Sequence, residues 1–125
     1  MTRIESANSA TLRLKQAELS LRRSLGHVLD AEHITFEQWQ VLAALLERPG
    51  IRMTDLAEAA VLPAATLTRH VDRLVERALV IRRVDPADRR RAVVALSARG
   101  KHLAKRLREV ESRADVSADA LSARG

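Results

Sequence analysis

The chain has 125 residues, of which 46% are hydrophobic, so it is long enough for one folded domain and too apolar for a disordered one. It contains no cysteine, which excludes a disulfide framework, a thiolate zinc site and a thiol redox switch. No apolar run approaches the roughly 18 residues of a membrane span, and the N-terminus lacks the layout of a signal peptide, so we expect a soluble cytoplasmic protein.

The formal net charge of +6 comes entirely from the second half of the chain. Residues 1–63 carry 7 basic and 8 acidic side chains, whereas residues 64–125 carry 15 basic and 8 acidic ones. Such a basic half is expected where a protein meets a polyanion. A solvated basic surface without a partner explains the charge equally well, so charge alone does not decide between the two.

Residues 11–29 form the first long amphipathic segment and predict a helix. One apolar stripe, with Ala17 between its members, consists of Leu14, Leu21, Leu25 and Val28. A second stripe, rotated away from the first, holds Leu12 and Leu19. A surface helix needs only one such stripe, so the second indicates a contact with a partner or, as the alternative, with other helices of the same chain.

Thr35 predicts the start of a second helix, because Gln38 follows it with the spacing of a capping box. The apolar positions of this helix are Phe36, Trp39, Leu42, Leu45 and Leu46. We assign Trp39, the single tryptophan, to the core rather than to a ligand site. Pro49-Gly50 predicts the turn that ends the helix.

A short third helix is predicted over residues 55–60. Thr54 has the side chain of an N-cap, and Asp55 lies near the positive end of the helix dipole. Pro63 favours the first turn of a fourth helix, which we expect to run to about Ala78.

The fourth helix divides its side chains between two faces. At about 100° per residue, one buried stripe contains Leu67, Val71, Leu74 and Ala78. The opposite face contains Ala65, Arg69, Asp72 and Glu76, and the flanks contain Thr66, Thr68 and Arg73. The pattern is typical of a helix that packs on one side and presents polar and basic groups on the other.

Two β-branched runs, residues 79–84 and 92–96, are joined by a polar loop and predict a β-hairpin. The loop is too long for a tight two-residue turn, so we expect it to project from the fold. Three adjacent arginines, Arg89, Arg90 and Arg91, lie at its tip.

A last long helix follows, with Ser97 as its cap and an apolar face formed by Leu103, Leu107 and Val110. Beyond Asp115 the pattern predicts no element. Two short helices, the second exposing basic residues, and then a hairpin with an arginine tip describe a winged helix-turn-helix. We therefore predict a mainly α fold with a small β-hairpin wing and flanking dimerisation helices.

Groove geometry connects this arrangement to DNA. The major groove admits one helix, whose N-terminal side chains reach base edges, and an arginine-rich hairpin can enter the narrow minor groove beside it. Ala64 and Ala65 are small enough to permit close approach at the start of the fourth helix. The candidate set for base reading or phosphate binding is Thr66, Thr68 and Arg69.

Several segments resemble the MarR family of bacterial transcriptional regulators. They are Ile34-Thr35 through Leu46, Met53-Thr54-Asp55-Leu56-Ala57, Thr66 through Leu74, Leu79-Val80, Asp85-Pro86-Ala87-Asp88-Arg89-Arg90 and Val94 through Gly100. The most specific part is the wing motif Asp-Pro-x-Asp-Arg-Arg, followed by a strand and Leu-Ser-x-x-Gly. The resemblance covers about residues 10–113, most of the chain.

The resemblance implies a homodimer whose two recognition helices face successive major grooves of a pseudo-palindromic operator in double-stranded DNA. Residues 11–30 and 98–125 would then form the dimerisation helices, and residues 34–97 the winged helix-turn-helix. Many members release DNA when a small, often aromatic or phenolic effector enters between these regions. We therefore expect a repressor of this type, in the cytoplasm at the bacterial nucleoid.

The family's functional residues carry over by position. Thr66, Thr68, Arg69 and Arg73 match its recognition-helix contacts, and Asp88 and Arg90 match the acid and the arginine of its wing. In the family the acid commonly braces an arginine while an arginine enters the minor groove. The sequence does not choose among Arg89, Arg90 and Arg91 for that role. Ala78 replaces the usual glycine, which costs roughly 1 kcal/mol if this position is left-handed.

Two other classes of function, an enzyme and a protein-binding module, compete with DNA binding. An enzyme is disfavoured, because the four histidines lack metal-ligand spacing and the chain has no phosphate-binding loop or nucleophile motif; we expect no cofactor and no metal. A winged helix that binds a protein instead of DNA is the alternative. The arginines of the fourth helix and the hairpin favour nucleic acid.

Overall fold

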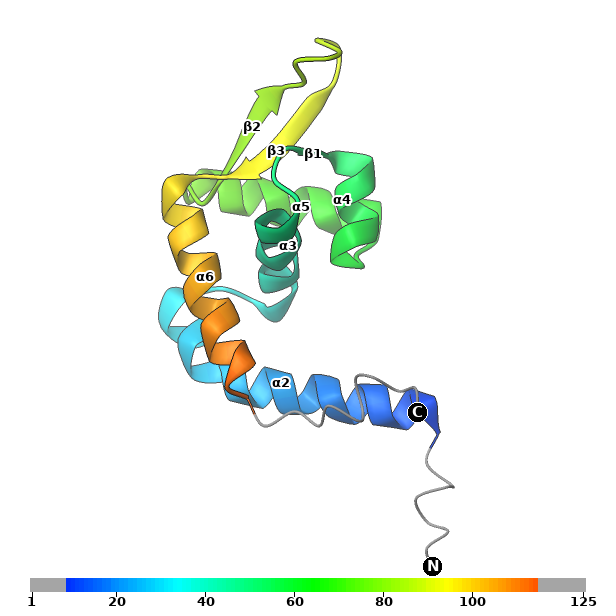
Figure 1. The fold of residues 1–125 in the computed structure, drawn as a ribbon, viewed down its shortest axis with the longest axis vertical. Coiled ribbons are helices and arrows are strands. Elements are labelled where there is room, and N and C mark those ends of the chain that lie inside the picture. Colours follow the sequence, from blue (N-terminus) through cyan, green and yellow to red (C-terminus); the bar gives the residue numbers. More distant parts are fainter. Residues whose placement is uncertain (1–8, 115–125) are drawn as a thin grey trace, which may run out of the picture.

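A computed structural model describes residues 9–114 of the chain (Figure 1). It is mainly helical with a small antiparallel sheet, as predicted. The elements are α2 (Ala10–Glu32), α3 (Phe36–Glu47), β1 (Ile51–Arg52), α4 (Met53–Ala60), α5 (Ala64–Glu76), β2 (Val80–Val84), β3 (Ala92–Leu96) and α6 (Ala98–Ser112). The predicted dimerisation segment 98–125 is thus described only as far as residue 114.

Helix α3 lies in the middle of the fold, between α6 on one side and α4 on the other (Figure 1). It begins at the capping box predicted from Thr35 and Gln38, in which each side chain bonds to the backbone of the other residue at 3.0 Å. Trp39 is 2% exposed, which confirms its place in the core. The core around α3 also includes Leu25 of α2 and Leu107 of α6, so one continuous core joins both ends of the described chain.

The sheet has three strands in the order β1-β3-β2, one more than the hairpin predicted from the sequence. Strand β1 pairs with β3 through Ile51 and Val94. Because the chain passes from β1 directly into α4, the N-cap of α4 is Arg52, and it makes no side-chain capping bond. The prediction that Thr54 caps this helix is therefore wrong, although Asp55 lies in its first turn as expected.

Helix α5 is shorter at both ends than predicted. Pro63 is its N-cap, not part of its first turn, and the helix ends at Glu76. Ala78 is left-handed, with φ of +60°, and is exposed, so it does not belong to the buried stripe. The left-handed turn lets the backbone N–H of Leu79 bond to the carbonyl of Leu74, and the buried Leu79 side chain fills the core instead.

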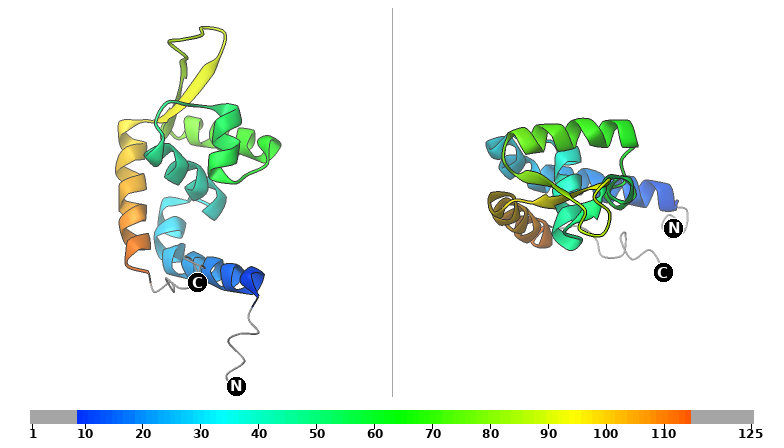
Figure 2. Two further views of the ribbon diagram at one scale, coloured as in Figure 1. Left: turned by 45° about the vertical axis from the view of Figure 1, so that its right-hand side comes forward. Right: turned by 90° about the horizontal axis from the view of Figure 1, so that it is seen from above.

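Helix α2 projects past the rest of the fold with its N-terminal half (Figures 1 and 2). Its buried residues are Ala17, Leu25 and Leu29. Leu12, Leu14 and Leu19 are about half exposed, at 56%, 52% and 47%. The second stripe, Leu12 and Leu19, therefore lies uncovered. Leu14 of the first stripe is not in the core either, because it lines a hollow beside α3 and stays half exposed.

Between residues 9 and 114, no helix combines the length and the apolar character that crossing a bilayer requires. The same part of the chain holds no group of three or more histidine, aspartate or glutamate residues that could bind a metal ion.

Candidate nucleic-acid interface

Helix α5 buries one side and exposes the other, as the sequence predicted. Leu67, Val71 and Leu74 are buried, whereas most of the candidate residues are exposed: Ala64, Ala65, Thr68, Arg69 and Arg73. Thr66 is half-buried. The Thr68 hydroxyl donates to the carbonyl of Ala64 at 3.1 Å, so its oxygen still has acceptor capacity toward solvent.

The N-terminal turn of α5 is open to a bound acceptor. Its N-cap is a proline, which makes no side-chain capping bond, and the first N–H groups of a helix have no partner within the helix. These N–H groups and the helix dipole favour an anionic group at this end. Ala64 and Ala65, which come directly after Pro63, add little bulk there.

The wing loop, residues 85–91, is organised around Asp88. Its carboxylate accepts hydrogen bonds from the backbone N–H of Arg90 at 3.1 Å and from Nε of Arg90 at 3.2 Å. It also pairs with Nε of Arg91 at 3.2 Å. The bond from the Arg90 side chain is the main cause that holds the Asp88 pKa below its ordinary value. Asp88 thus lies where an acid that braces wing arginines is expected.

The three wing arginines differ in how they are held. The Arg90 side chain is 89% exposed although it is bound to Asp88, and Arg91 is 54% exposed. Arg89 makes no hydrogen bond or ion pair with any residue of the described part of the chain. The wing therefore presents two arginines that are exposed and held by Asp88, and Arg90 is the more exposed of the two.

A second carboxylate, Asp85, anchors the base of the wing, although the sequence motif that contains it predicted no role for it. Asp85 is 7% exposed, and its carboxylate accepts from the Ala87 N–H at 2.9 Å and from Nε of Arg52 at 3.2 Å. Its own N–H donates to the carbonyl of Arg91 at 2.9 Å, which closes the loop. The bond from Ala87, with Arg52 adding to it, keeps the pKa of Asp85 below its ordinary value. An aspartate two residues before the bonded N–H is a known turn signal.

Helix α5 and the wing are joined, but each exposes its own arginines. Asp72 of α5 forms an ion pair with Arg82 of β2. The wing loop projects beyond the body of the fold, so its arginines stand apart from the exposed face of α5 (Figure 1). Two protrusions of this kind suit two neighbouring grooves of one DNA duplex better than one compact ligand.

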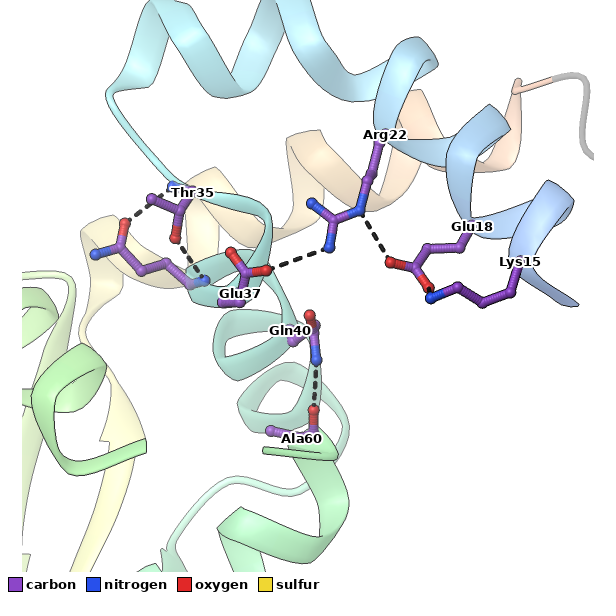
Figure 3. A network of polar contacts seen from close by, with 8 residues as sticks. Lys15, Glu18, Arg22, Thr35, Glu37, Gln40 and Ala60 are labelled. Atoms are coloured by element: carbon purple, nitrogen blue, oxygen red, sulfur yellow. Dashed lines mark hydrogen bonds and ion pairs between the residues drawn. The ribbon is translucent and has the colours of Figure 1, made fainter. Parts of the chain in front are cut away.

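A hollow of about 460 Å³ lies between α2, α3 and the turn after α4. Its apolar lining includes Leu14, Leu21, Phe36 and Leu62. Beside it, Arg22 bonds to Glu18 at 3.0 Å and to Glu37 at 3.2 Å (Figure 3). The Arg22 guanidinium also lies 4.3 Å from the centre of the Phe36 ring. The bond to Arg22 is the largest cause that lowers the pKa of Glu18.

Gln40 completes the polar side of this hollow by donating to the carbonyl of Ala60 at 2.9 Å, which ties α3 to the end of α4 (Figure 3). Only the Glu18–Arg22 spacing, four residues along one helix, could have been noticed in the sequence. The contacts from Arg22 to α3 depend on how the two helices cross.

Two known transcriptional regulators are similar to this chain in sequence. The HTH-type transcriptional regulator FarR of Neisseria gonorrhoeae is 30% identical over 109 residues, 86% of this chain and 75% of FarR. The transcriptional regulator HosA of Escherichia coli is 43% identical over 70 residues, and the match spans about half of its length (52%) and 56% of this chain.

Two solved structures resemble the fold closely. NadR in complex with 4-hydroxyphenylacetate has a TM-score of 0.76 at 30% identity, with 84% of this chain and 74% of NadR covered. The repressor CouR, bound to a 23-mer DNA duplex, has a TM-score of 0.68 at 26% identity, with 81% and 71% covered. A sequence model of the MarR family matches residues 34–91, which run from just before α3 to the end of the wing loop. The chain belongs to the MarR family.

Proposed function

We propose that this protein is a sequence-specific regulator of transcription that binds double-stranded DNA as a homodimer. The observation that carries the proposal is the pairing of helix α5, which is open at its N-terminus and exposes Arg69 and Arg73, with a wing whose arginines are braced by Asp88. CouR, a relative with the same fold, is a repressor bound to a DNA duplex. The proposed activity is binding rather than catalysis, and it needs neither metal nor cofactor.

In this proposal α5 enters the major groove and the wing enters the minor groove. Ala64 and Ala65 allow the helix end to approach the DNA closely, while Thr66, Thr68, Arg69 and Arg73 contact bases or phosphates. Of the wing arginines, Arg90 enters the minor groove, because its direction is held by Asp88 and it is more exposed than Arg91, which Asp88 also holds. Arg89 and Arg91 bind the flanking phosphates.

The dimer places two such units on a pseudo-palindromic operator on the bacterial chromosome. The exposed Leu12 and Leu19 lie on one side of α2 and supply an apolar face that a second copy would cover. Residues 11–30 and 98–125 are the proposed dimerisation helices, and residues 34–97 the DNA-binding region.

The hollow between α2 and α3 is the proposed effector site. Its size suits a small aromatic molecule, and NadR, a relative with this fold, binds 4-hydroxyphenylacetate. An effector there would contact both the helix that carries the dimer face and the helix at the centre of the DNA-binding region. We therefore propose a repressor that a small aromatic or phenolic effector releases from DNA.

Selection of bound fragments from random DNA tests the proposal directly. Wild-type protein should enrich a two-fold symmetric site. Arg69→Ala should lose about 1–3 kcal/mol of binding free energy and relax the preference at one position of each half-site. Arg90→Ala should keep the major-groove preference but flatten any preference for A·T-rich flanks.

Arg108→Ala serves as the control, because Arg108 is exposed on α6, away from α5 and the wing. It should select the same sites as wild type. The proposal is wrong if wild-type protein enriches no sequence and its affinity for DNA is no higher than that of protein blocked with heparin. That result would favour the alternative, a winged helix that binds a protein.

A further inference from the structure

The C-terminal end of α2 is capped by an arginine from a distant part of the chain. The last carbonyls of a helix lack partners within the helix and carry its negative dipole end, and α2 has no basic residue in its own last turn. Arg77 supplies the missing donors: Nη2 donates to the carbonyl of Glu32 at 2.7 Å and Nη1 donates to that of His33 at 2.8 Å. Both bonds are short and charge-assisted.

Arg77 is also the residue that ends the recognition helix. It is the C-cap of α5, and its backbone N–H donates to the carbonyl of Arg73 at 3.2 Å. One residue therefore ends α5 with its backbone and caps α2 with its side chain. The guanidinium is planar and binds both carbonyls at once, so it constrains direction as well as distance between the two helix ends.

A second arginine binds the same end of α2 but leads to a different helix. Nη1 of Arg106, on α6, bonds to the Glu32 carboxylate at 3.1 Å. Helix α2 packs extensively on α6, so this bond reinforces an interface that apolar contacts already hold. The Arg77 bonds instead connect α2 directly to the end of α5.

The far end of α2 carries the exposed leucines and lines the hollow beside Arg22. A 23-residue helix is about 35 Å long, so a small rotation at its capped end moves its far end by several ångströms. The angle between α2 and α5 therefore decides how far apart two recognition helices lie when two copies join through α2.

We propose that Arg77 is a positioning residue that sets the angle between α2 and α5 and thereby the half-site spacing that the dimer accepts. The expected effect on half-site spacing rests on the proposed function. The expected effect on the angle between α2 and α5 rests only on the two hydrogen bonds from Arg77. Arg77 itself is not assigned any contact with DNA.

The first test measures binding to operators whose half-sites are moved apart or together by one base pair. Wild type should prefer one spacing near the helical repeat of DNA, about 10–10.5 base pairs or a multiple of it. In Arg77→Met, which keeps an apolar stem but has no donor, the ratio of affinities between the best and the shifted spacing should fall roughly tenfold. Arg77→Lys, which keeps the charge and a donor but lacks the planar two-nitrogen fork, should restore only part of the ratio.

Arg106→Met is the matched control, because it removes an arginine bond from the same residue, Glu32, without touching α5. It should lower stability somewhat and leave the spacing ratio unchanged. The proposal is overturned if Arg77→Met keeps the wild-type ratio, or if Arg106→Met reduces the ratio as much. Should Arg77→Met fail to fold, Arg77→Gln, which retains one donating group, takes its place under the same criteria.

The second test needs no DNA, so it separates failure of this inference from failure of the proposed function. The chain has no cysteine, so spin labels can be placed at Ser24→Cys on α2 and Thr68→Cys on α5 alone. With labelled protein diluted in unlabelled protein, the Ser24–Thr68 distance distribution should broaden or shift in Arg77→Met and not in Arg106→Met. An unchanged distribution in Arg77→Met would overturn the inference even if the protein binds DNA as proposed.

Discussion

Gly100 lies directly against the carbonyl oxygen of Leu79: a Cβ at Gly100 would stand 1.9 Å from that oxygen. Through this contact, the first turn of α6 packs directly against the backbone of Leu79, which follows the end of α5. Ser97 strengthens the same joint, because its hydroxyl donates to the carbonyl of Ala78 and its N–H to that of Leu79 at 3.0 Å. The glycine of the Leu-Ser-x-x-Gly motif is therefore needed because the Leu79 backbone leaves no room for a side chain, and not because the position requires a positive φ.

Replacing Gly100 with alanine should destabilise the fold by about 2–3 kcal/mol, because backbone must shift to admit the methyl group. Gly26→Ala is the matched control: Gly26 lies inside α2, and nothing stands within 4 Å of its added Cβ. That change should stabilise the protein by about 0.5–1 kcal/mol. Urea unfolding followed by circular dichroism measures both, and equal effects of the two substitutions would contradict the contact.

Ala78→Gly should stabilise the protein by about 0.5–1 kcal/mol, because Ala78 has φ of +60° and glycine adopts this conformation without strain. Val61→Gly should gain at least as much, since Val61 is β-branched, has φ of +59° and is 79% exposed, so little packing is lost. Thermal and urea unfolding report the gains. Ala59→Gly, in the exposed part of α4, should instead lose about 0.5–1 kcal/mol; a loss at position 78 would mean that Ala78 is not left-handed.

Asp85→Asn should lower the free energy of unfolding at neutral pH, because the charged carboxylate accepts from Ala87 and Arg52. The Asp85 pKa is lower in the folded than in the unfolded chain. Its charged form therefore stabilises the fold above the ordinary pKa of 3.8, and this contribution is lost as pH falls through the folded-state pKa.

The difference in unfolding free energy between wild type and Asp85→Asn should thus shrink between neutral pH and about pH 3. Urea titrations at several pH values measure it. Asp30→Asn, an exposed substitution on α2, should change stability little throughout. A difference that stays constant from neutral to acidic pH would show that the Asp85 charge does not hold the wing base.

DNA binding should weaken steeply with salt, because each phosphate neutralised by an arginine contributes close to −0.9 to the slope of log K against log salt concentration. Two or more such contacts per subunit give a slope steeper than about −3 for the dimer. Fluorescence anisotropy with a labelled operator measures the slope. Removing the charges of Arg89 and Arg91 together should make it shallower, and a wild-type slope near zero would rule out the proposed phosphate contacts.

Patterns that act over three or four residues were predictable. The capping box of Thr35 and Gln38, the Ser97 cap and the buried stripe of α5 each depend on neighbours along one helix, and the structure confirms them. The Asp88 brace was predictable from the resemblance to a family, since its partner Arg90 lies only two residues away. The left-handed backbone at Ala78 was predictable too, because the resembling family usually has a glycine at this position.

Features that depend on how distant segments meet were not predictable. Strand β1 has two residues and exists only because Val94 lies beside Ile51, so no local pattern marks it. Because strand β1 was not predicted, the start of α4 was predicted wrongly as well: α4 begins directly where β1 ends, so its N-cap is Arg52 and not Thr54. The bonds from Arg52 to Asp85 and from Arg77 to α2 join residues far apart in sequence, and each arginine alone looks like surface charge.

The pairing of Ile51 with Val94 sets an order on the folding of the nascent chain. Helices α3, α4 and α5 leave the ribosome before β3 does, so the strand that leads into α4 has no partner while they emerge. Closing this pairing joins residues of long sequence separation, which is slow compared with forming a helix. The recognition helix therefore gains its final support only after most of the chain has been synthesised, when β3 aligns between β1 and β2.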